Sequence, residues 1–211
     1  MVLRGVEKRY AIAASTYDVA FRLLSLGCGP ELHRLAAHEL VVSTGDTVLD
    51  LGCGTGLLVP YLLDQVGQDG KVIAVDVSPG MIRKAQERVN THQWRNVVLH
   101  CQDVRTFRAD NLVQGVVFCL SLSTFPDCEA VLRRAVTFLQ PGKRLVIVDA
   151  FLNQGKWYYP LANAYTRVKA VIVGSEVHNH LREVTAELLE DIRSVESCHG
   201  LYSVICGKRP R

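Results

Sequence analysis

Residues 47–56 read Thr-Val-Leu-Asp-Leu-Gly-Cys-Gly-Thr-Gly, and this stretch decides the fold. It begins as a short apolar run and ends as a glycine-rich turn. A helical pattern follows over residues 57–66, so the turn joins a strand to a helix. Glycines in such a turn adopt positive φ and let the main chain approach a ligand closely. The stretch therefore predicts a ligand-binding loop at the end of a buried strand.

The spacing of the glycines indicates which ligand the loop takes. A dinucleotide fingerprint needs glycine at the position where this chain has Leu57. Here the pattern is G-x-G-x-G, with Asp50 two residues before Gly52. A carboxylate at this position disfavours a pyrophosphate at the helix N-terminus and favours a ligand that carries an ammonium group. The loop therefore favours a cationic small molecule over a dinucleotide.

The rest of the chain repeats the alternation of strand and helix. Near-continuous Val, Ile and Leu runs indicate strands that are covered on both faces, which is typical of a parallel α/β sheet. Two late runs, 192–196 and 202–206, are expected to add an antiparallel edge, and Thr185 is expected to cap the helix before them. The four strands expected after the first one are 71–76, 97–101, 112–120 and 144–149.

The segment Asp50–Gly56 resembles motif I of the class I S-adenosylmethionine-dependent methyltransferases, E/D-x-G-x-G-x-G. Further landmarks of that family follow in the same order, so the resemblance covers about residues 45–150. One departure is Lys143, which stands where the family's L-x-P-G-G motif has its second glycine. The landmarks are Asp76, Ser78–Met81, Gln102–Val104, Phe118–Ser121 and Leu139–Lys143.

This resemblance implies a Rossmann-like, doubly wound α/β fold with a seven-stranded sheet of order 3-2-1-4-5-7-6, strand 7 antiparallel, and N-terminal lid helices. It also implies S-adenosyl-L-methionine as the cofactor. Asp50 and the glycines would hold the methionine part, Asp76 both ribose hydroxyls, and Asp103 the adenine amino group. The full set of implied cofactor-binding residues is Asp50, Gly52, Cys53, Gly54, Thr55, Gly56, Asp76, Val77, Met81, Asp103, Val104, Cys119, Leu120 and Tyr17.

The N-terminal segments 14–18 and 23–27 resemble the region ahead of motif I in ubiquinone and menaquinone C-methyltransferases (UbiE-like, methyltransferase type 11). Bacterial phospholipid N-methyltransferases carry similar segments. The resemblance implies that residues 1–45 form a helical lid and that 46–211 form one methyltransferase domain, with acceptor-pocket elements mainly at 150–190. Tyr17 would then lie near the methionine end; alternatively, it is a core residue of an amphipathic helix.

The expected reaction is methyl transfer to a small, hydrophobic acceptor, which is quinone-like, a lipid or another metabolite. The alternatives are a cofactor-binding protein without transferase activity and a phospholipid or amine N-methyltransferase. Because alignment and proximity supply most of the catalysis, a catalytic side chain need not be conspicuous. The candidates are His178, His180 and Tyr17, although the two histidines also fit a polar surface turn. His-x-His could bind a metal, but the sequence offers no evident third ligand, so no metal site is expected.

The charge and hydrophobicity of the chain indicate which classes of partner are not expected. The chain has 211 residues, with 24 Lys and Arg and 21 Asp and Glu, so its net charge is +3. This small net charge disfavours a protein that binds nucleic acid mainly through its overall electrostatic field. The family's N-P-P-Y motif for base methylation is also missing at residues 121–124. No apolar run reaches about 18 residues, so we expect a cytoplasmic monomer or homodimer with at most peripheral membrane contact. The seven cysteines form no C-x-x-C pair, and reduced thiols are expected.

Overall fold

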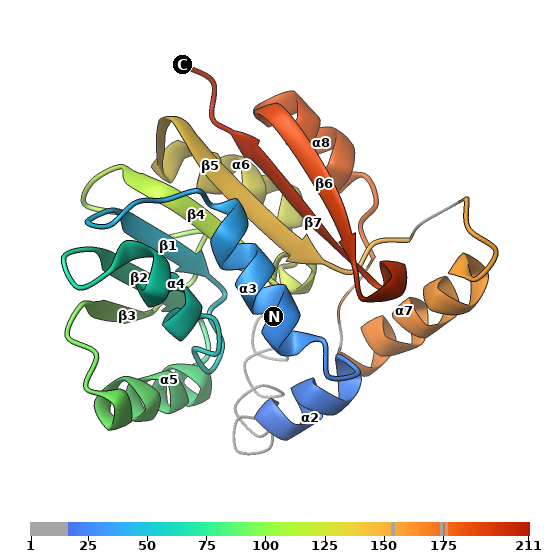
Figure 1. Ribbon diagram of the computed structural model, residues 1–211, viewed down its shortest axis with the longest axis horizontal. Coiled ribbons are helices and arrows are strands. Elements are labelled where there is room, and N and C mark those ends of the chain that lie inside the picture. Colours follow the sequence, from blue (N-terminus) through green and yellow to red (C-terminus); the bar gives the residue numbers. More distant parts are fainter. Residues whose placement is uncertain (1–16, 153–154, 174, 176) are drawn as a thin grey trace.

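The computed structural model describes residues 17–211 except 153, 154, 174 and 176. Its centre is a seven-stranded sheet of order β3-β2-β1-β4-β5-β7-β6 (Figure 1). Strand β7 runs antiparallel to both β5 and β6, and the other pairs are parallel. The fold class and the strand order expected from the family resemblance are thereby confirmed. The strands are β1 Thr47–Leu51, β2 Lys71–Asp76, β3 Val97–Cys101, β4 Val113–Cys119, β5 Leu139–Asp149, β6 Glu190–Ser197 and β7 Tyr202–Lys208.

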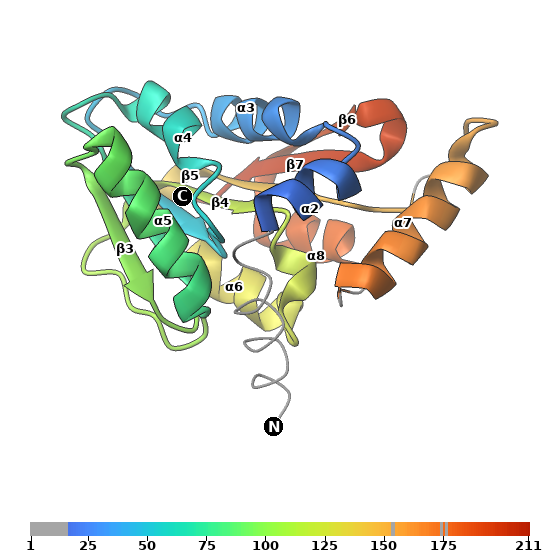
Figure 2. The same ribbon diagram turned by 90° about the horizontal axis from the view of Figure 1, so that it is seen from below.

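Helices cover both faces of this sheet, with α3 and α4 on one side and α6 and α8 on the other (Figure 2). Among the described helices, none combines the length and the apolar character needed to cross a membrane. The helices are α2 Tyr17–Leu24, α3 Gly29–Glu39, α4 Val59–Val66, α5 Pro79–His92, α6 Cys128–Phe138, α7 Tyr159–Val173 and α8 Leu181–Leu188, and two short 3₁₀ turns are η1 Leu122–Thr124 and η2 Cys198–Gly200.

Strand β5 shows why the apolar runs are nearly continuous. Successive side chains of a strand point to opposite faces of the sheet. Val146 and Val148 accordingly pack with α3 and α4, whereas Leu145 and Ile147 pack with α6 and α8. Because each face has its own buried core, every position along the run is apolar.

The C-terminal elements begin earlier than expected. Helix α8 spans Leu181–Leu188, so Thr185 lies inside it and is no cap; the Thr185 hydroxyl donates to the Leu181 carbonyl at 2.6 Å. Strand β6 likewise starts at Glu190. The helical pattern over residues 181–192 contains a break at Leu189, where the backbone becomes extended, and the turn signals of the sequence did not reveal it.

The expectation of reduced thiols is wrong for one pair. Cys28 and Cys198 form a disulfide across a sequence separation of 170, with their Cα atoms 6.3 Å apart. The bond ties the start of α3 to η2, between β6 and β7. Cysteine spacing could not reveal this pair, because only the packing of α3 against the C-terminal strands brings the two residues together. The unpaired cysteines are Cys53, Cys101, Cys119, Cys128 and Cys206.

Candidate functional site

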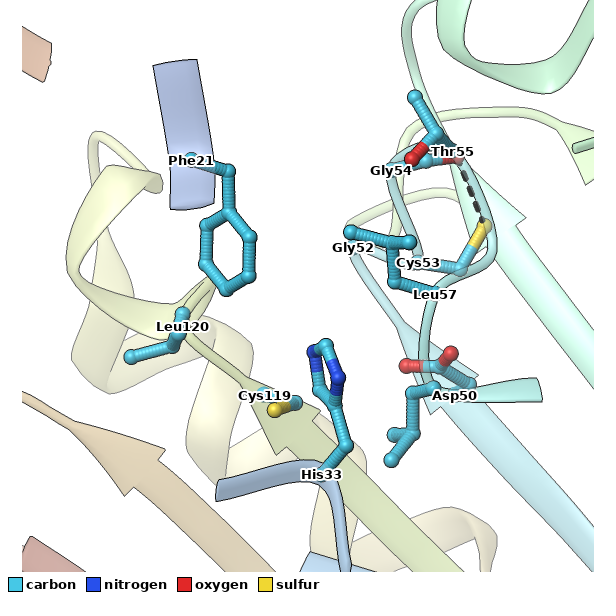
Figure 3. A pocket seen from close by; sticks show the side chains of 11 residues that line it. Phe21, His33, Asp50, Gly52, Cys53, Gly54, Thr55, Leu57, Cys119 and Leu120 are labelled. Atoms are coloured by element: carbon cyan, nitrogen blue, oxygen red, sulfur yellow. Dashed lines mark hydrogen bonds between the residues drawn. The ribbon is translucent and has the colours of Figure 1, made fainter. Parts of the chain in front are cut away.

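A pocket of about 400 Å³, part of it open to solvent, lies at the carboxyl ends of β1 and β4 (Figure 3). These neighbouring strands are the point where the strand order reverses, and ligands of open α/β sheets bind outside the strand ends at such a point. The pocket is lined by Phe21, His33, Asp50, Gly52, Cys53, Gly54, Thr55, Leu57, Leu58, Cys119 and Leu120.

The three glycines of the loop have different structural roles, although each has a positive φ of 55–78°. A Cβ on Gly52 would lie 2.6 Å from the Ser121 Cβ, so this glycine allows the loop to pack on the end of β4. A Cβ on Gly56 would meet Ala85 of α5 at 3.4 Å. Gly54 has no atom within 4 Å of its Cβ position and therefore leaves open space in the pocket wall.

Asp50 is a buried carboxylate at the end of β1, and its side chain points toward the pocket (Figure 3). Burial, and secondly the charge of Asp76, raise the pKa of Asp50 to about 8. Within the described structure, its Oδ2 atom is buried and has no hydrogen-bond partner. An unsatisfied buried acceptor is unfavourable by about 1–3 kcal/mol, more for a charged group. An ammonium group placed in the pocket would supply the missing donor and charge, so the residues fit the amino-acid part of S-adenosylmethionine.

Asp76 connects the glycine loop to the turn before α5. Its Oδ2 accepts from the Gly54 N–H at 2.9 Å, and its Oδ1 accepts from the Ser78 N–H at 2.8 Å. Burial raises the pKa of the Asp76 carboxyl, and these two backbone hydrogen bonds oppose the shift. Each oxygen retains a further acceptor position, so a ligand diol could still be held here.

Asp103 already has a partner. Its Oδ1 and Oδ2 accept from the Arg105 Nε at 3.1 and 3.0 Å, and the Arg105 Nη2 donates to Oδ2 at 2.6 Å. The Arg105 side chain holds the pKa of Asp103 below its usual value. An adenine amino group at this site would therefore share the carboxylate with Arg105. The predicted cofactor residues that do not line the pocket are Gly56, Asp76, Val77, Met81, Asp103 and Val104, of which Met81 and Val104 are buried.

Helix α2 closes over the glycine loop through Asp18. The Thr55 hydroxyl donates to Asp18 Oδ1 at 2.6 Å, and the Arg88 Nη2 donates to Asp18 Oδ2 at 2.8 Å. Sequence reasoning missed Asp18, because its partners are far away along the chain. Tyr17 begins α2, but its side chain lies outside the described part of the structure.

Phe21 and His33 form an aromatic wall that the sequence did not reveal. Their rings stack with centroids 5.7 Å apart, and the His33 ring points into the space between Cys119 and Asp50 (Figure 3). Burial, and secondly the positive charge of Arg88, lower the pKa of His33 to about 4. His33 is therefore a neutral imidazole near pH 7.

A second polar cluster lies on the far side of Cys119, at the end of β5. Asp149 is buried and accepts hydrogen bonds from the Ser123 N–H and hydroxyl at 2.9 and 3.0 Å. The Lys169 Nζ of α7 lies 4.1 Å from the centre of the Tyr202 ring, and burial lowers the pKa of Lys169 to about 8 against the opposing charge of Asp149. Burial, and then the charges of Asp50 and Asp149, raise the pKa of the Cys119 thiol. Cys119 lines the pocket and pairs with Val148, the residue before Asp149, so this cluster adjoins the pocket.

The predicted catalytic histidines do not line this pocket. His178 and His180 lie in the connection before α8, with ring centroids 5.3 Å apart. In the segment before α7, Trp157 is 91% exposed and lies outside this pocket. Tyr165 instead joins the helices, since its hydroxyl donates to the Leu24 carbonyl at 2.7 Å and so fixes α7 to α2.

Known proteins resemble this chain along most of its length. A family model described as a methyltransferase domain matches residues 42–201. The demethylmenaquinone methyltransferase of Desulfitobacterium hafniense is 26% identical over 98% of this chain and 90% of its own length. The aklanonic acid methyltransferase DauC of a Streptomyces species is 32% identical over 72% of this chain and 68% of its own length.

A solved structure supports the same fold. It is a complex of the Haloferax volcanii Trm112 methyltransferase activator with a methyltransferase, and it matches with a TM-score of 0.74 and 16% identity over 96% of this chain and 98% of that chain. Fold, family match and relatives agree, and the cofactor of the family is S-adenosylmethionine. The chain therefore belongs to the methyltransferase-domain family, as a class I S-adenosylmethionine-dependent methyltransferase.

Proposed function

We propose that this enzyme methylates a small, mainly apolar acceptor that carries an ionisable hydroxyl group, as a quinol does. The observation that carries the proposal is the presence of two titratable side chains with shifted pKa values, the buried Asp50 on β1 and the half-buried Lys169 on α7. Asp50 suits the cationic cofactor, and Lys169 suits an anionic oxygen of the acceptor. The names of the two relatives support a small-molecule acceptor, because they refer to demethylmenaquinone and aklanonic acid.

On the cofactor side, Asp50 Oδ2 accepts a hydrogen bond from the ammonium group and Asp76 accepts from the ribose hydroxyls. Asp103 accepts from the adenine amino group, beside Arg105. The bound cofactor supplies an electrophilic methyl group on a sulfonium centre. Val77, Met81 and Val104 would contact the adenine of the bound cofactor, and the remaining predicted residues would hold its methionine part, with Tyr17 contributed by the lid of residues 1–45.

On the acceptor side, residues 150–190 of the single domain 46–211 carry the main elements. Phe21 and the neutral His33 exclude water and align the acceptor, so that proximity supplies most of the rate enhancement. The Lys169 ammonium group donates to the acceptor oxygen and stabilises its anion, while the hydroxyl proton passes to solvent. Burial lowers the pKa of Lys169, whereas the opposing charge of Asp149 favours its ammonium form.

The test follows a radiolabelled methyl group from S-adenosylmethionine into a cell extract that is then separated into lipid-soluble and aqueous fractions. We expect label in the lipid-soluble fraction, in a product that partitions as a weak acid or a hydroxylated ring compound. Label confined to polar amines would contradict the acceptor class, and no transfer into any fraction would favour a cofactor-binding protein. Asp76→Ala is expected to abolish both transfer and calorimetric cofactor binding, whereas the exposed Asp64→Asn leaves both unchanged.

The proposal includes no nucleic-acid partner and at most peripheral membrane contact. It places a monomer or homodimer in the cytoplasm. Sedimentation of the purified protein without lipid gives its oligomeric state. Sedimentation with lipid vesicles tests the membrane contact, because co-sedimentation that persists at high salt would indicate more than a peripheral contact.

A further inference from the structure

Three metal-ligating side chains converge outside the methyl-transfer pocket. Cys128 is the first residue of α6, and His178 and His180 lie in the connection that leads into α8. One ligand atom from each residue, a sulfur and two imidazole nitrogens, all lie within 4.8 Å of one another. Helices α6 and α8 lie on the same face of the sheet, which brings these segments together (Figure 2). Cys128 is therefore the candidate third ligand, which the spacing of the His-x-His segment does not reveal.

Backbone and side-chain hydrogen bonds hold the His-x-His segment in place. The Asn179 Oδ1 accepts from the Leu152 N–H at 2.9 Å, and the Asn179 Nδ2 donates to the Leu152 carbonyl at 3.2 Å. The Leu181 N–H donates to the His178 carbonyl at 3.1 Å and closes a turn. Asn179 thus anchors the segment to the end of β5, while the flanking rings meet Cys128.

The donor set suits one class of metal. One thiolate and two imidazoles are typical Zn²⁺ ligands, whereas Mg²⁺ and Ca²⁺ prefer oxygen ligands. Bond lengths of about 2.0–2.3 Å in a tetrahedral site place the ligand atoms about 3.3–3.8 Å apart, so small side-chain rotations complete the geometry. Cys128 is buried and His180 is exposed, which leaves the fourth position on the solvent side.

We propose that Cys128, His178 and His180 bind one Zn²⁺ ion that fastens the connection before α8 to the start of α6. The Cys128 thiol loses its proton to solvent as the sulfur–zinc bond forms, and both histidines bind as neutral imidazoles. A water molecule completes the coordination. The site is separate from the methyl-transfer pocket, since none of the three residues lines it.

The test uses tag-free protein, purified without added reductant so that the Cys28–Cys198 disulfide stays intact, which is loaded with zinc, dialysed and analysed for metal. We expect one zinc per chain, a higher melting temperature with zinc, and tetrahedral Co²⁺ absorption with a thiolate-to-cobalt charge-transfer band after substitution. Cys128→Ser and His180→Gln are each expected to weaken zinc binding by at least about tenfold. Even substitutions of residues that only hydrogen-bond to a metal ligand lower metal affinity by that factor. Cys128→Ser also removes the charge-transfer band.

Matched controls are Cys101→Ser and His38→Gln, an exposed thiol and an exposed imidazole outside the cluster. Their zinc affinity is expected to equal that of the unmodified protein. Because His180 is exposed, its replacement leaves the metal-free fold intact, which circular dichroism checks. Sub-stoichiometric zinc, or an affinity that all four variants share, would mean an adventitious ion only and would overturn the proposal.

Discussion

The two walls of the pocket are built in different ways. The wall that faces the cofactor comes from one strand, one turn and the main chain of residues 50–56. The opposite wall comes from side chains of α2, α3 and β4, with Asp149, Lys169 and Tyr202 behind it. One wall is local in the sequence, and the other depends on contacts between segments that are far apart in it.

The two walls therefore respond differently to substitution. A main-chain loop binds the same cofactor with almost any neighbouring side chains, provided that the glycines and the acid are present. A wall of side chains changes with each substitution, and specificity depends on such groups. We therefore propose that side chains of α2, α3 and α7, rather than the glycine loop, determine which acceptor is bound.

The strongest test of the local wall is Gly52→Ala. A methyl group there would lie 2.6 Å from the Ser121 Cβ, at a φ of +77°. Overpacking and left-handed strain together are expected to lower the free energy of unfolding by about 2–4 kcal/mol. Urea unfolding measures this change. Gly45→Ala is the control, because Gly45 has a φ of +89° but no atom within 4 Å of its Cβ position. Equal losses in the two variants would refute the packing role of Gly52.

Asp50→Asn tests the charge in the same wall. Removing the carboxylate that would pair with an ammonium group is expected to weaken cofactor binding by about 10–100-fold, measured by calorimetry. Asp64→Asn, an exposed substitution on α4, should leave the affinity unchanged. Cofactor affinity that survives Asp50→Asn would show that the buried acceptor serves the fold alone.

The pH dependence of stability sharpens this test. The pKa of Asp50 is raised to about 8, so the folded protein retains a proton that the unfolded chain loses near pH 4. The contribution of Asp50 to the free energy of unfolding therefore falls as the pH rises from about 4 to about 8. Asp50→Asn should remove this contribution and leave those from the raised pKa values of Asp76 and Asp149. Cofactor binding should release a proton in the same pH range, which calorimetry in buffers of different ionisation enthalpy detects.

Lys169→Met tests the opposite wall. Loss of the ammonium group is expected to lower kcat/KM for the acceptor by about 10–30-fold while the cofactor Kd stays unchanged. Because the pKa of Lys169 is about 8, activity should decline as the pH rises through 8. Lys169→Arg should keep the charge and move this decline to higher pH. A parallel loss of cofactor affinity in Lys169→Met would show that the two walls do not act separately.

The smallest effect on cofactor affinity is expected at the contact between α2 and the glycine loop. Asp18→Asn weakens the contacts of α2 with Thr55 and Arg88, and the Asp18 side chain is 45% exposed. Partly exposed pairs contribute about 0.2–1 kcal/mol, so cofactor affinity should fall by about two- to fivefold. Thr55→Val should produce a similar loss that is not additive with Asp18→Asn. Additive losses would mean that the hydrogen bond between these two residues does not close the helix over the loop.

The sequence by itself determined the parallel α/β sheet and the glycine-rich loop at the end of β1. Strand β1, its acid and the turn through Gly56 are consecutive, so local pattern and spacing were sufficient to identify them. The resemblance to a known family added the strand order, which the structure confirms.

Only the tertiary structure decided which distant side chains meet. Packing of helices on both faces of the sheet brings three sets of distant side chains together. These are Asp18 with Thr55, Cys28 with Cys198, and Cys128 with the two histidines of the His-x-His segment. Likewise, whether Thr185 caps a helix or lies inside one depends on where α8 packs. The physical reason is that main-chain conformation follows from local residues, whereas contacts between distant side chains depend on strand register and helix packing.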